Sequence, residues 1–103
     1  MNQFDVIANP FPRSQERQPF LVVLQSDLLT RTLSTTVVAP LEPAGGQFAD
    51  RLNPTVTVEG KSFCLIVQEL ATVRRSVLSD HHGSVAAERD KIIAALDMLF
   101  TGI

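Results

Sequence analysis

The segment TVTVEGKSFCLIV, residues 55–67, contains the clearest secondary-structure signal in the sequence. Residues 55–58 alternate threonine with valine, which is the period of two expected of a strand with one buried face. Residues 62–67 form a second run that is rich in apolar side chains. The connection between the runs, Glu59-Gly60-Lys61, is short and contains a glycine, as hairpin turns commonly do. The segment therefore predicts a β-hairpin with a three-residue connection.

Four other segments predict strands, at residues 4–9, 20–24, 35–39 and 72–78. In the first, Phe4, Val6 and Ala8 share one face because side chains alternate along a strand. The second is a continuous apolar run that fits a buried strand or a helix fragment, and Pro19 at its start favours the strand. The third is β-branched and ends at Pro40, which has no N–H to donate to a sheet.

The pattern changes from strand to helix at Ser84. No proline or glycine occurs between Ser84 and Phe100, and Ser84 is a residue type that caps helix amino termini. Gly102 lies at the expected end of the helix. Apolar residues recur at helical spacing along one face, at Ile92, Leu96, Leu99 and Ile103. Strands followed by one terminal helix indicate an α+β fold.

The composition is typical of one small folded domain. Of the 103 residues 45% are hydrophobic and 19% are charged, so a packed core is expected over residues 1–103 as a single domain. A formal net charge of −2 argues against direct nucleic acid binding through phosphate contacts. Because no apolar run has membrane-spanning length and no leader is visible, we expect a soluble cytoplasmic protein without membrane contact.

No group of residues in the sequence predicts catalysis, a metal site or a cofactor. His81 and His82 are adjacent, so their side chains diverge, and we expect them in a polar turn. Ser79, Asp80 and His81 are consecutive and cannot converge on one reacting atom as a catalytic triad does. The single cysteine, Cys64, lies among apolar residues and is expected to be buried and inert. The sequence therefore favours a protein that acts by binding.

The carboxyl-terminal residues Met98-Leu99-Phe100-Thr101-Gly102-Ile103 are unusually apolar. Chain ends are normally polar and frayed, so an apolar end needs a surface to pack against. Two interpretations stay open: the end docks on the protein's own sheet, or it forms part of a surface for a partner.

Five segments, taken in order along the chain, share a pattern with one known family. The first three are residues 1–4, the hydrophobic run of residues 22–24 with the Gln25-Ser26-Asp27-Leu28-Leu29 that follows it, and Val37-Val38-Ala39-Pro40-Leu41. The last two are residues 53–103 as a whole and, at their end, Phe100-x-Gly102-Ile103. On these residues the sequence resembles the CcdB family of toxin–antitoxin toxins. The resemblance covers the chain except the loops at residues 9–18 and 42–52, where the polar residues 13–18 predict a solvated loop.

The resemblance implies a fold, a partner and a mode of action. The fold would be a small SH3-like barrel of antiparallel strands, of the CcdB/MazF type, with a carboxyl-terminal α-helix, and the protein would be a homodimer. It would act in the cytoplasm as a toxin that binds the GyrA subunit of DNA gyrase and traps the cleaved gyrase–DNA complex. A CcdA-type antitoxin would neutralise it. No catalytic group is needed for this action.

Carried over by position, the resemblance assigns gyrase binding to Leu28, Leu29, Asp97, Thr101, Gly102 and Ile103, and the dimer interface to Leu99 and Phe100. The four-residue spacing of Asp97 and Thr101 places both on one helix face. The family's best-known member has tryptophan where this chain has Thr101, and asparagine where it has Asp97. Those tryptophans are thought to hold an arginine of gyrase between them, a cation–π contact that threonine cannot make.

Two alternative functions stay open. A CcdB-like protein that lacks this tryptophan could bind an antitoxin or another target without poisoning gyrase. Related toxins of the MazF type cut RNA, and candidates for such an endoribonuclease would be Arg31, Arg74, Arg75 and the two histidines. Two adjacent arginines are, however, more often part of a solvated face.

Overall fold

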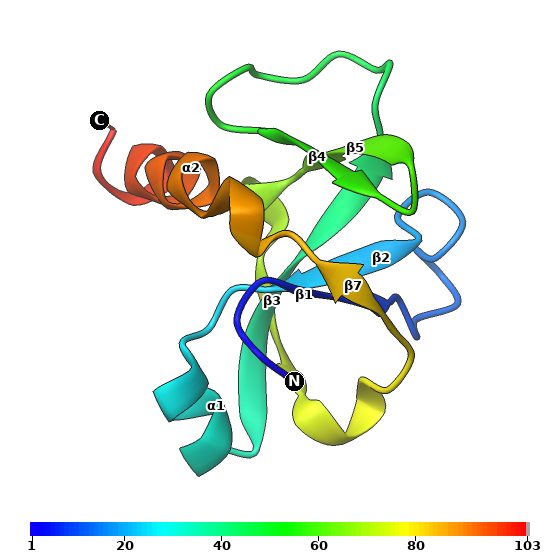
Figure 1. Ribbon diagram of the computed structural model, residues 1–103, viewed down its shortest axis with the longest axis vertical. Coiled ribbons are helices and arrows are strands. Elements are labelled where there is room, and N and C mark those ends of the chain that lie inside the picture. Colours follow the sequence, from blue (N-terminus) through cyan, green and yellow to red (C-terminus); the bar gives the residue numbers. More distant parts are fainter. Residues whose placement is uncertain (103) are drawn as a thin grey trace.

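The computed structural model describes residues 1–102 and consists of a curled antiparallel sheet with a short helix, α1, and a longer one, α2 (Figure 1). The strands are β1 (Asp5–Ala8), β2 (Phe20–Val23), β3 (Thr35–Pro43), β4 (Thr55–Val58), β5 (Lys61–Leu65), β6 (Ala71–Arg74) and β7 (His81–Ser84). The helices are α1 (Asp27–Thr32) and α2 (Arg89–Thr101), with 3-10 turns η1 (Val67–Glu69), η2 (Arg75–Val77) and η3 (Ala86–Glu88). The predicted α+β fold, a small barrel-like antiparallel sheet with a carboxyl-terminal helix, is confirmed.

The strand order is β4-β5-β3-β2-β1-β7, and β6 also pairs with β3. β3 connects the parts of this sheet because it pairs with β2, with β6 along its first half and with β5 at its end. Figure 1 shows β3 running through the molecule, with α1 near one end and the β4–β5 hairpin near the other. β4 and β7 are the outermost strands of this order, so each pairs with a neighbouring strand on one edge only.

Pro40 lies inside β3, so the prediction that this strand ends at Pro40 is wrong. Its carbonyl accepts a hydrogen bond from the Ile66 N–H at 2.9 Å. In an antiparallel strand the N–H and C=O of one residue point to the same edge, so the N–H that Pro40 lacks would point to the edge of β3 that faces Ile66. Ile66 lies between the end of β5 and the start of β6, so no described strand pairs with that edge of β3 at this point. A proline is tolerated there because no neighbouring strand needs its donor.

The sheet is buried on both faces, which explains why the β2 sequence is apolar throughout. One face and α2 enclose a core that includes Val6, Val22, Leu41, Leu65 and Ile92. The other face carries a second cluster of Ile7, Leu21, Val23, Val38 and Leu78. Each fully buried side chain of this size stabilises the fold by roughly 1.5–3 kcal/mol relative to an exposed one.

The predicted hairpin is confirmed, but its connection has two residues and not three. Lys61 belongs to β5 and pairs with Val58. The turn residues Glu59 and Gly60 have φ values of +51° and +79°, as a type I′ turn requires. This turn twists in the same sense as the flanking strands, so it closes the hairpin with one residue fewer. Glu59 is a non-glycine residue held in the left-handed region, which costs energy.

The carboxyl-terminal helix begins at Arg89, five residues after the predicted Ser84. Ser84 instead ends β7, and its Oγ accepts a hydrogen bond from the Ala86 N–H at 3.1 Å. The two histidines lie in β7 and not in a turn, because pairing with β1 imposes an extended backbone on them. Gly102 ends the helix as predicted, with a φ of +77°.

Two further differences concern short elements. The strand predicted for residues 72–78 ends at Arg74, where η2 begins, and α1 has no counterpart in the prediction. A helix of six residues shows too little periodicity to be recognised from sequence. Within residues 1–102, no helix combines the length and the apolar character needed to cross a membrane.

Candidate functional site

α1 is held against the sheet by polar contacts on its inner side. The Thr30 side chain is buried, and its Oγ1 lies 3.2 Å from Oγ1 of the buried Thr36 on β3. Asp27 Oδ1 accepts a hydrogen bond from the Gln3 N–H at 2.6 Å, which fixes the first turn. The opposite side of α1 then faces outward, so that Leu28 is 73% exposed and Leu29 is 49% exposed. Two adjacent leucines this exposed form an apolar surface that the fold itself does not use.

The end of α2 presents a second apolar surface. Ile92 and Ala95 are buried in the core, and Leu96 and Leu99 pack against it as partly buried side chains. Phe100 lies off this face and is 70% exposed. Of the two open interpretations of the apolar chain end, docking on the protein's own sheet therefore holds for Leu99, whereas Phe100 is left available to a partner.

Asp97 and Thr101 lie on one exposed face of α2, as their spacing predicts. The Thr101 hydroxyl donates a hydrogen bond to the Asp97 carbonyl at 2.6 Å. Gly102 is exposed and follows directly, and its N–H donates to the Met98 carbonyl at 2.9 Å. These three gyrase-binding candidates thus form one continuous surface at the helix end. The fourth candidate of this end, Ile103, lies outside the described residues.

A groove of about 310 Å³ lies beside the exposed Phe100 and is lined by Leu24, Gln25, Val37, Leu70, Leu96 and Phe100. Leu24 and Gln25 lead into α1, while Leu96 and Phe100 belong to α2; Figure 1 shows α1 at the lower left and α2 at the upper left of the view. We refer to this groove with Leu28, Leu29, Asp97, Thr101 and Gly102 as the α1–α2 face. The groove therefore lies between the end of α2 and the segment that enters α1, and its lining includes none of Leu28, Leu29, Asp97, Thr101 and Gly102.

Sequence reasoning did not single out Gln25, Val37 or Leu70 as parts of this surface. Leu70 follows a 3-10 turn, and Val37 is a partly exposed residue of a strand whose neighbours Thr36 and Val38 are buried. Neither position interrupts the local pattern of its element.

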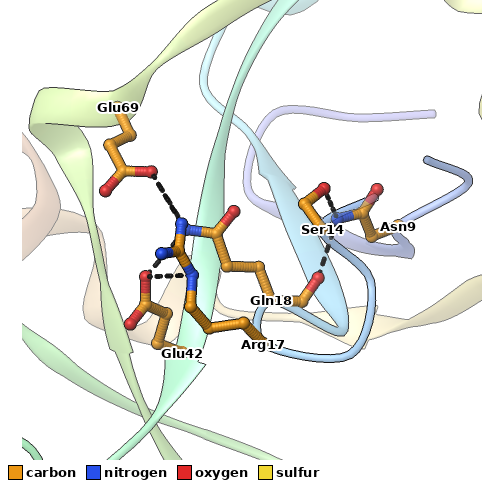
Figure 2. Close-up of polar contacts among 6 residues, drawn as sticks. All are labelled: Asn9, Ser14, Arg17, Gln18, Glu42 and Glu69. Carbon is orange, nitrogen blue, oxygen red and sulfur yellow. Dashed lines mark hydrogen bonds and ion pairs between the residues drawn. The ribbon is translucent and has the colours of Figure 1, made fainter. Parts of the chain in front are cut away.

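A second polar cluster fixes the loop between β1 and β2 (Figure 2). The buried Gln18 donates from Nε2 to Glu42 Oε2 at 2.7 Å and to Glu69 Oε1 at 3.0 Å. The Arg17 guanidinium lies 3.7 Å from each of the same two carboxylates. Asn9 Nδ2 donates to the Gln18 carbonyl at 2.8 Å. The loop at residues 13–18 is exposed at Arg13 and at residues 15–17, as predicted, but Gln18 at its end is buried and anchors it to β3 and η1.

The endoribonuclease candidates do not gather at one place. Arg74 pairs with Thr35 at the β3–β6 edge, and the Arg75 N–H donates to the Ser34 carbonyl at 3.0 Å. His81 and His82 lie on β7, which β3, β2 and β1 separate from β6 in the sheet order. His81 Nε2 is paired with Asp5 Oδ2 at 3.2 Å. Within the described part of the chain, Arg74 and Arg75 therefore lie at and just after β6, which pairs with β3, the histidines lie on β7 at one end of the sheet path, and Arg31 lies in α1.

Metal ligation has no candidate residues in the range 1–102, where no group of three or more His, Cys, Asp or Glu side chains is placed to hold an ion. Cys64 is buried in β5, as the sequence predicts, and its Sγ lies 3.9 Å from Thr55 Oγ1. A buried thiol of this kind contributes to packing.

The family model for the CcdB protein matches residues 3–102, nearly the whole chain. The chain belongs to the CcdB family. Membership of this family indicates a toxin of a toxin–antitoxin system. The match also includes the loops at residues 9–18 and 42–52, which the segment-by-segment resemblance leaves out. No curated protein matches this CcdB-family chain at a significant level.

Solved structures with a similar fold include a MazF toxin and two endoribonucleases. The Mycobacterium tuberculosis toxin MazF-mt6 has a TM-score of 0.74 and 14% identity, over 95% of this chain and 96% of that one. An endoribonuclease from a mycobacterial species has a TM-score of 0.69 and 14% identity, over 95% and 88%. An endoribonuclease in complex with its cognate antitoxin has a TM-score of 0.68 and 13% identity, over 95% and 92%. At this identity the likeness is one of fold.

Proposed function

We propose that this CcdB-family protein is a homodimeric toxin that binds GyrA through the α1–α2 face, traps the cleaved gyrase–DNA complex and is neutralised by a CcdA-type antitoxin. The proposal is supported by the CcdB model's match over residues 3–102, together with the exposed Leu28 and Leu29 on α1 and the exposed Asp97, Phe100, Thr101 and Gly102 at the end of α2. A toxin of this kind needs a binding surface and no catalytic group.

The α1–α2 face has the properties of a protein-binding surface. Its centre is apolar, with Phe100 70% exposed beside a groove, and its edge carries the polar Asp97 and Thr101. An apolar centre with a polar rim is typical of protein–protein interfaces. In a two-fold homodimer each residue of the interface meets the partner's copy of the same face, so two α2 ends would lie close together. With Leu99 and Phe100 in the dimer interface, Asp97, Thr101 and Gly102 of both chains would lie next to that interface and form the surface offered to gyrase.

The decisive experiment incubates purified gyrase and supercoiled plasmid with the protein, followed by detergent and protease. A poison of the proposed type gives linear DNA in proportion to the amount of toxin added. Val77→Ala changes an exposed apolar residue on η2, outside the α1–α2 face, and should poison gyrase as the wild type does. It serves as the control for the loss of an exposed apolar side chain elsewhere on the surface. If gyrase runs normally at a large excess of the protein, the gyrase part of the proposal is wrong.

An antitoxin partner is supported by family membership and by the similar fold of an endoribonuclease that was solved with its cognate antitoxin. A CcdB-family protein that no longer poisons gyrase remains the alternative within this class. Growth arrest that substitution of Phe100 fails to relieve would favour a different contact surface. Expression without any growth arrest would favour a role in antitoxin binding alone.

Endoribonuclease activity is the second candidate, and the likeness of fold to MazF-mt6 and two endoribonucleases favours it. The separation of the arginines from the histidines in the sheet argues against it. Incubation of the protein with a defined RNA in a chelating buffer separates the two functions. Cleavage that is lost in Arg74→Ala and Arg75→Ala would replace the gyrase proposal.

A further inference from the structure

His82 occupies an irregular position in β7. In the pairing of β1 with β7, Val6 lies opposite Gly83 and the next residue, Ile7, lies opposite His81. His82 is therefore the extra residue of a β-bulge, and the following Gly83 has a φ of +121°. A bulge rotates the extra side chain away from the direction that a regular strand would give it.

The redirected His82 ring lies between two carboxylates from different segments. Its Nδ1 is 2.9 Å from Glu59 Oε2, at the turn of the β4–β5 hairpin, and its Nε2 is 3.4 Å from Asp80 Oδ2, just before β7. Both ring nitrogens therefore face an acceptor. A neutral imidazole can donate from one nitrogen only, whereas the protonated ring donates from both. Both contacts can therefore be hydrogen bonds at the same time only when the ring is an imidazolium.

Glu59, the partner across the gap, is also held in an unusual conformation. It has a φ of +51°, which a non-glycine residue adopts at an energetic cost. β4 and β7 are the two ends of the sheet path and do not pair through their backbones. The His82–Glu59 contact thus connects the two free ends of the curled sheet, and both residues lie at backbone irregularities.

Aromatic packing supports the ring from the inside of the curl. The His82 ring lies 5.0 Å from the Phe20 ring, which itself meets Phe63 edge-on at 5.4 Å. A protonated ring at this distance gains a cation–π contribution from Phe20. The residue of β2 that contacts the His82 ring is Phe20, which is uncharged. The other histidine of β7, His81, has its own carboxylate, Asp5 of β1.

We propose that His82 is a proton-dependent clasp that holds the β4–β5 hairpin against β7 and so closes the open side of the barrel. The proposal concerns the fold itself and is independent of whether the protein acts on gyrase. β7 continues through the buried Val85 into η3 and then α2. The clasp therefore also restrains the start of α2, the helix whose end contributes to the α1–α2 face.

The direction of the pH effect follows from the contacts. The hydrogen bond with Glu59 raises the pKa of His82, burial opposes this, and Asp80 acts in the same direction as Glu59. A group whose pKa is higher in the folded state contributes stability that is complete below the pKa of the unfolded chain, about 6.5. This contribution is lost as the pH rises through the folded-state pKa. The clasp is closed in mildly acidic solution and opens as the solution becomes alkaline.

The test uses the full chain and two measurements between pH 5.5 and 8.5. The first is the NMR titration of the His82 ring, and the second is hydrogen exchange of the β4 and β7 amides, expressed as protection relative to the intrinsic rate at each pH. We expect His82 to titrate above the ordinary histidine range and the protection of β4 and β7 to fall as His82 loses its proton. In Glu59→Gln the titration moves to lower pH, and the pH dependence of protection is reduced.

Two further variants make the test selective. His81→Gln removes the neighbouring histidine and should leave the His82 titration and the protection pattern in place. Glu59→Asn removes the charge but suits the first position of a type I′ turn, so the hairpin still forms. We expect this variant to lose the pH-dependent protection while keeping the β4–β5 pairing. If Glu59→Gln and Glu59→Asn both leave the His82 titration unchanged, or if protection of β4 and β7 is equal at pH 6 and pH 8 in the wild type, the clasp proposal is wrong.

Discussion

The side-chain hydroxyl of Thr101 donates to the backbone carbonyl of Asp97 at 2.6 Å, one turn earlier in α2. The bond is local to the helix, so the hydroxyl proton is already used by the protein's own backbone. Both residues are exposed at the end of α2. What the position offers a partner is therefore the threonine methyl group and the nearby Asp97 carboxylate, with no aromatic face.

Thr101→Trp is expected to strengthen gyrase poisoning. An indole face at this exposed position adds a cation–π contact with an arginine of the target, worth roughly 0.5–2 kcal/mol. Since about 1.4 kcal/mol corresponds to a tenfold change in affinity, half-maximal DNA linearisation should need about two- to thirtyfold less toxin. Thr101→Val is the matched control, because it removes the hydroxyl and adds no π-face. Equal poisoning by wild type and the tryptophan variant would contradict the prediction.

Phe100→Glu is expected to abolish self-association without unfolding the protein. The Phe100 side chain is 70% exposed, so its replacement removes little buried area within one chain. In the proposed homodimer the new carboxylate would be buried opposite its own copy, and like charges in an interface cost several kcal/mol. Sedimentation velocity should show a dimer for the wild type and a monomer for the variant.

A charge placed elsewhere controls for the change in solubility. Val77→Glu introduces the same side chain on η2, outside the α1–α2 face, and should leave the dimer intact. A wild-type protein that sediments as a monomer would remove the basis of this prediction.

The Thr30–Thr36 pair should show strong non-additivity. Each hydroxyl is buried, and the two oxygens lie 3.2 Å apart. Thr30→Val leaves the Thr36 hydroxyl without this partner, so we expect a loss of about 1–3 kcal/mol in the free energy of unfolding. The double variant Thr30→Val/Thr36→Val replaces both hydroxyls with methyl groups and should be less destabilised than the sum of the single variants. Urea unfolding of the four proteins measures the difference, and strict additivity would argue against the bond.

Gln18→Leu is expected to destabilise the protein by about 1–3 kcal/mol, because it leaves Glu42 and Glu69 without the amide that donates to both. Arg17→Ala is the matched control at the adjacent position. The Arg17 side chain is 68% exposed and its ion pairs are long, so its loss should cost no more than about 1 kcal/mol. Thermal unfolding of both variants tests the ranking, and a larger effect of Arg17→Ala would reverse our interpretation of Figure 2.

Part of this fold could be predicted because its signals are local. The alternation in residues 55–58, the glycine at position 60 and the apolar spacing of Ile92, Leu96 and Leu99 each depend on neighbours within one or two turns of the chain. The family resemblance also came from short segments in order, and the family match over residues 3–102 confirms it.

Other features depend on contacts between distant segments and left no local pattern. The two histidines looked like turn residues, but pairing with β1 makes them part of β7, and the bulge at His82 depends on the register with Val6 and Ile7. Gln18 looked like a loop residue, but Glu42 and Glu69 draw it inward. Polar residues such as these have weak intrinsic preferences, so the partner decides their conformation.

By itself, the sequence determined the strands up to the β4–β5 hairpin, the two-residue alternation of that hairpin and the existence of an apolar carboxyl-terminal helix, because backbone periodicity and side-chain polarity are properties of each segment. Only the tertiary structure decided which of those apolar residues stay outside. Leu99 packs on the core while Phe100, its neighbour, lines a groove with Leu24 and Leu70. The physical reason is that a helix can bury one face against a single sheet, and the position of that sheet is set by pairings between strands that lie far apart in the chain.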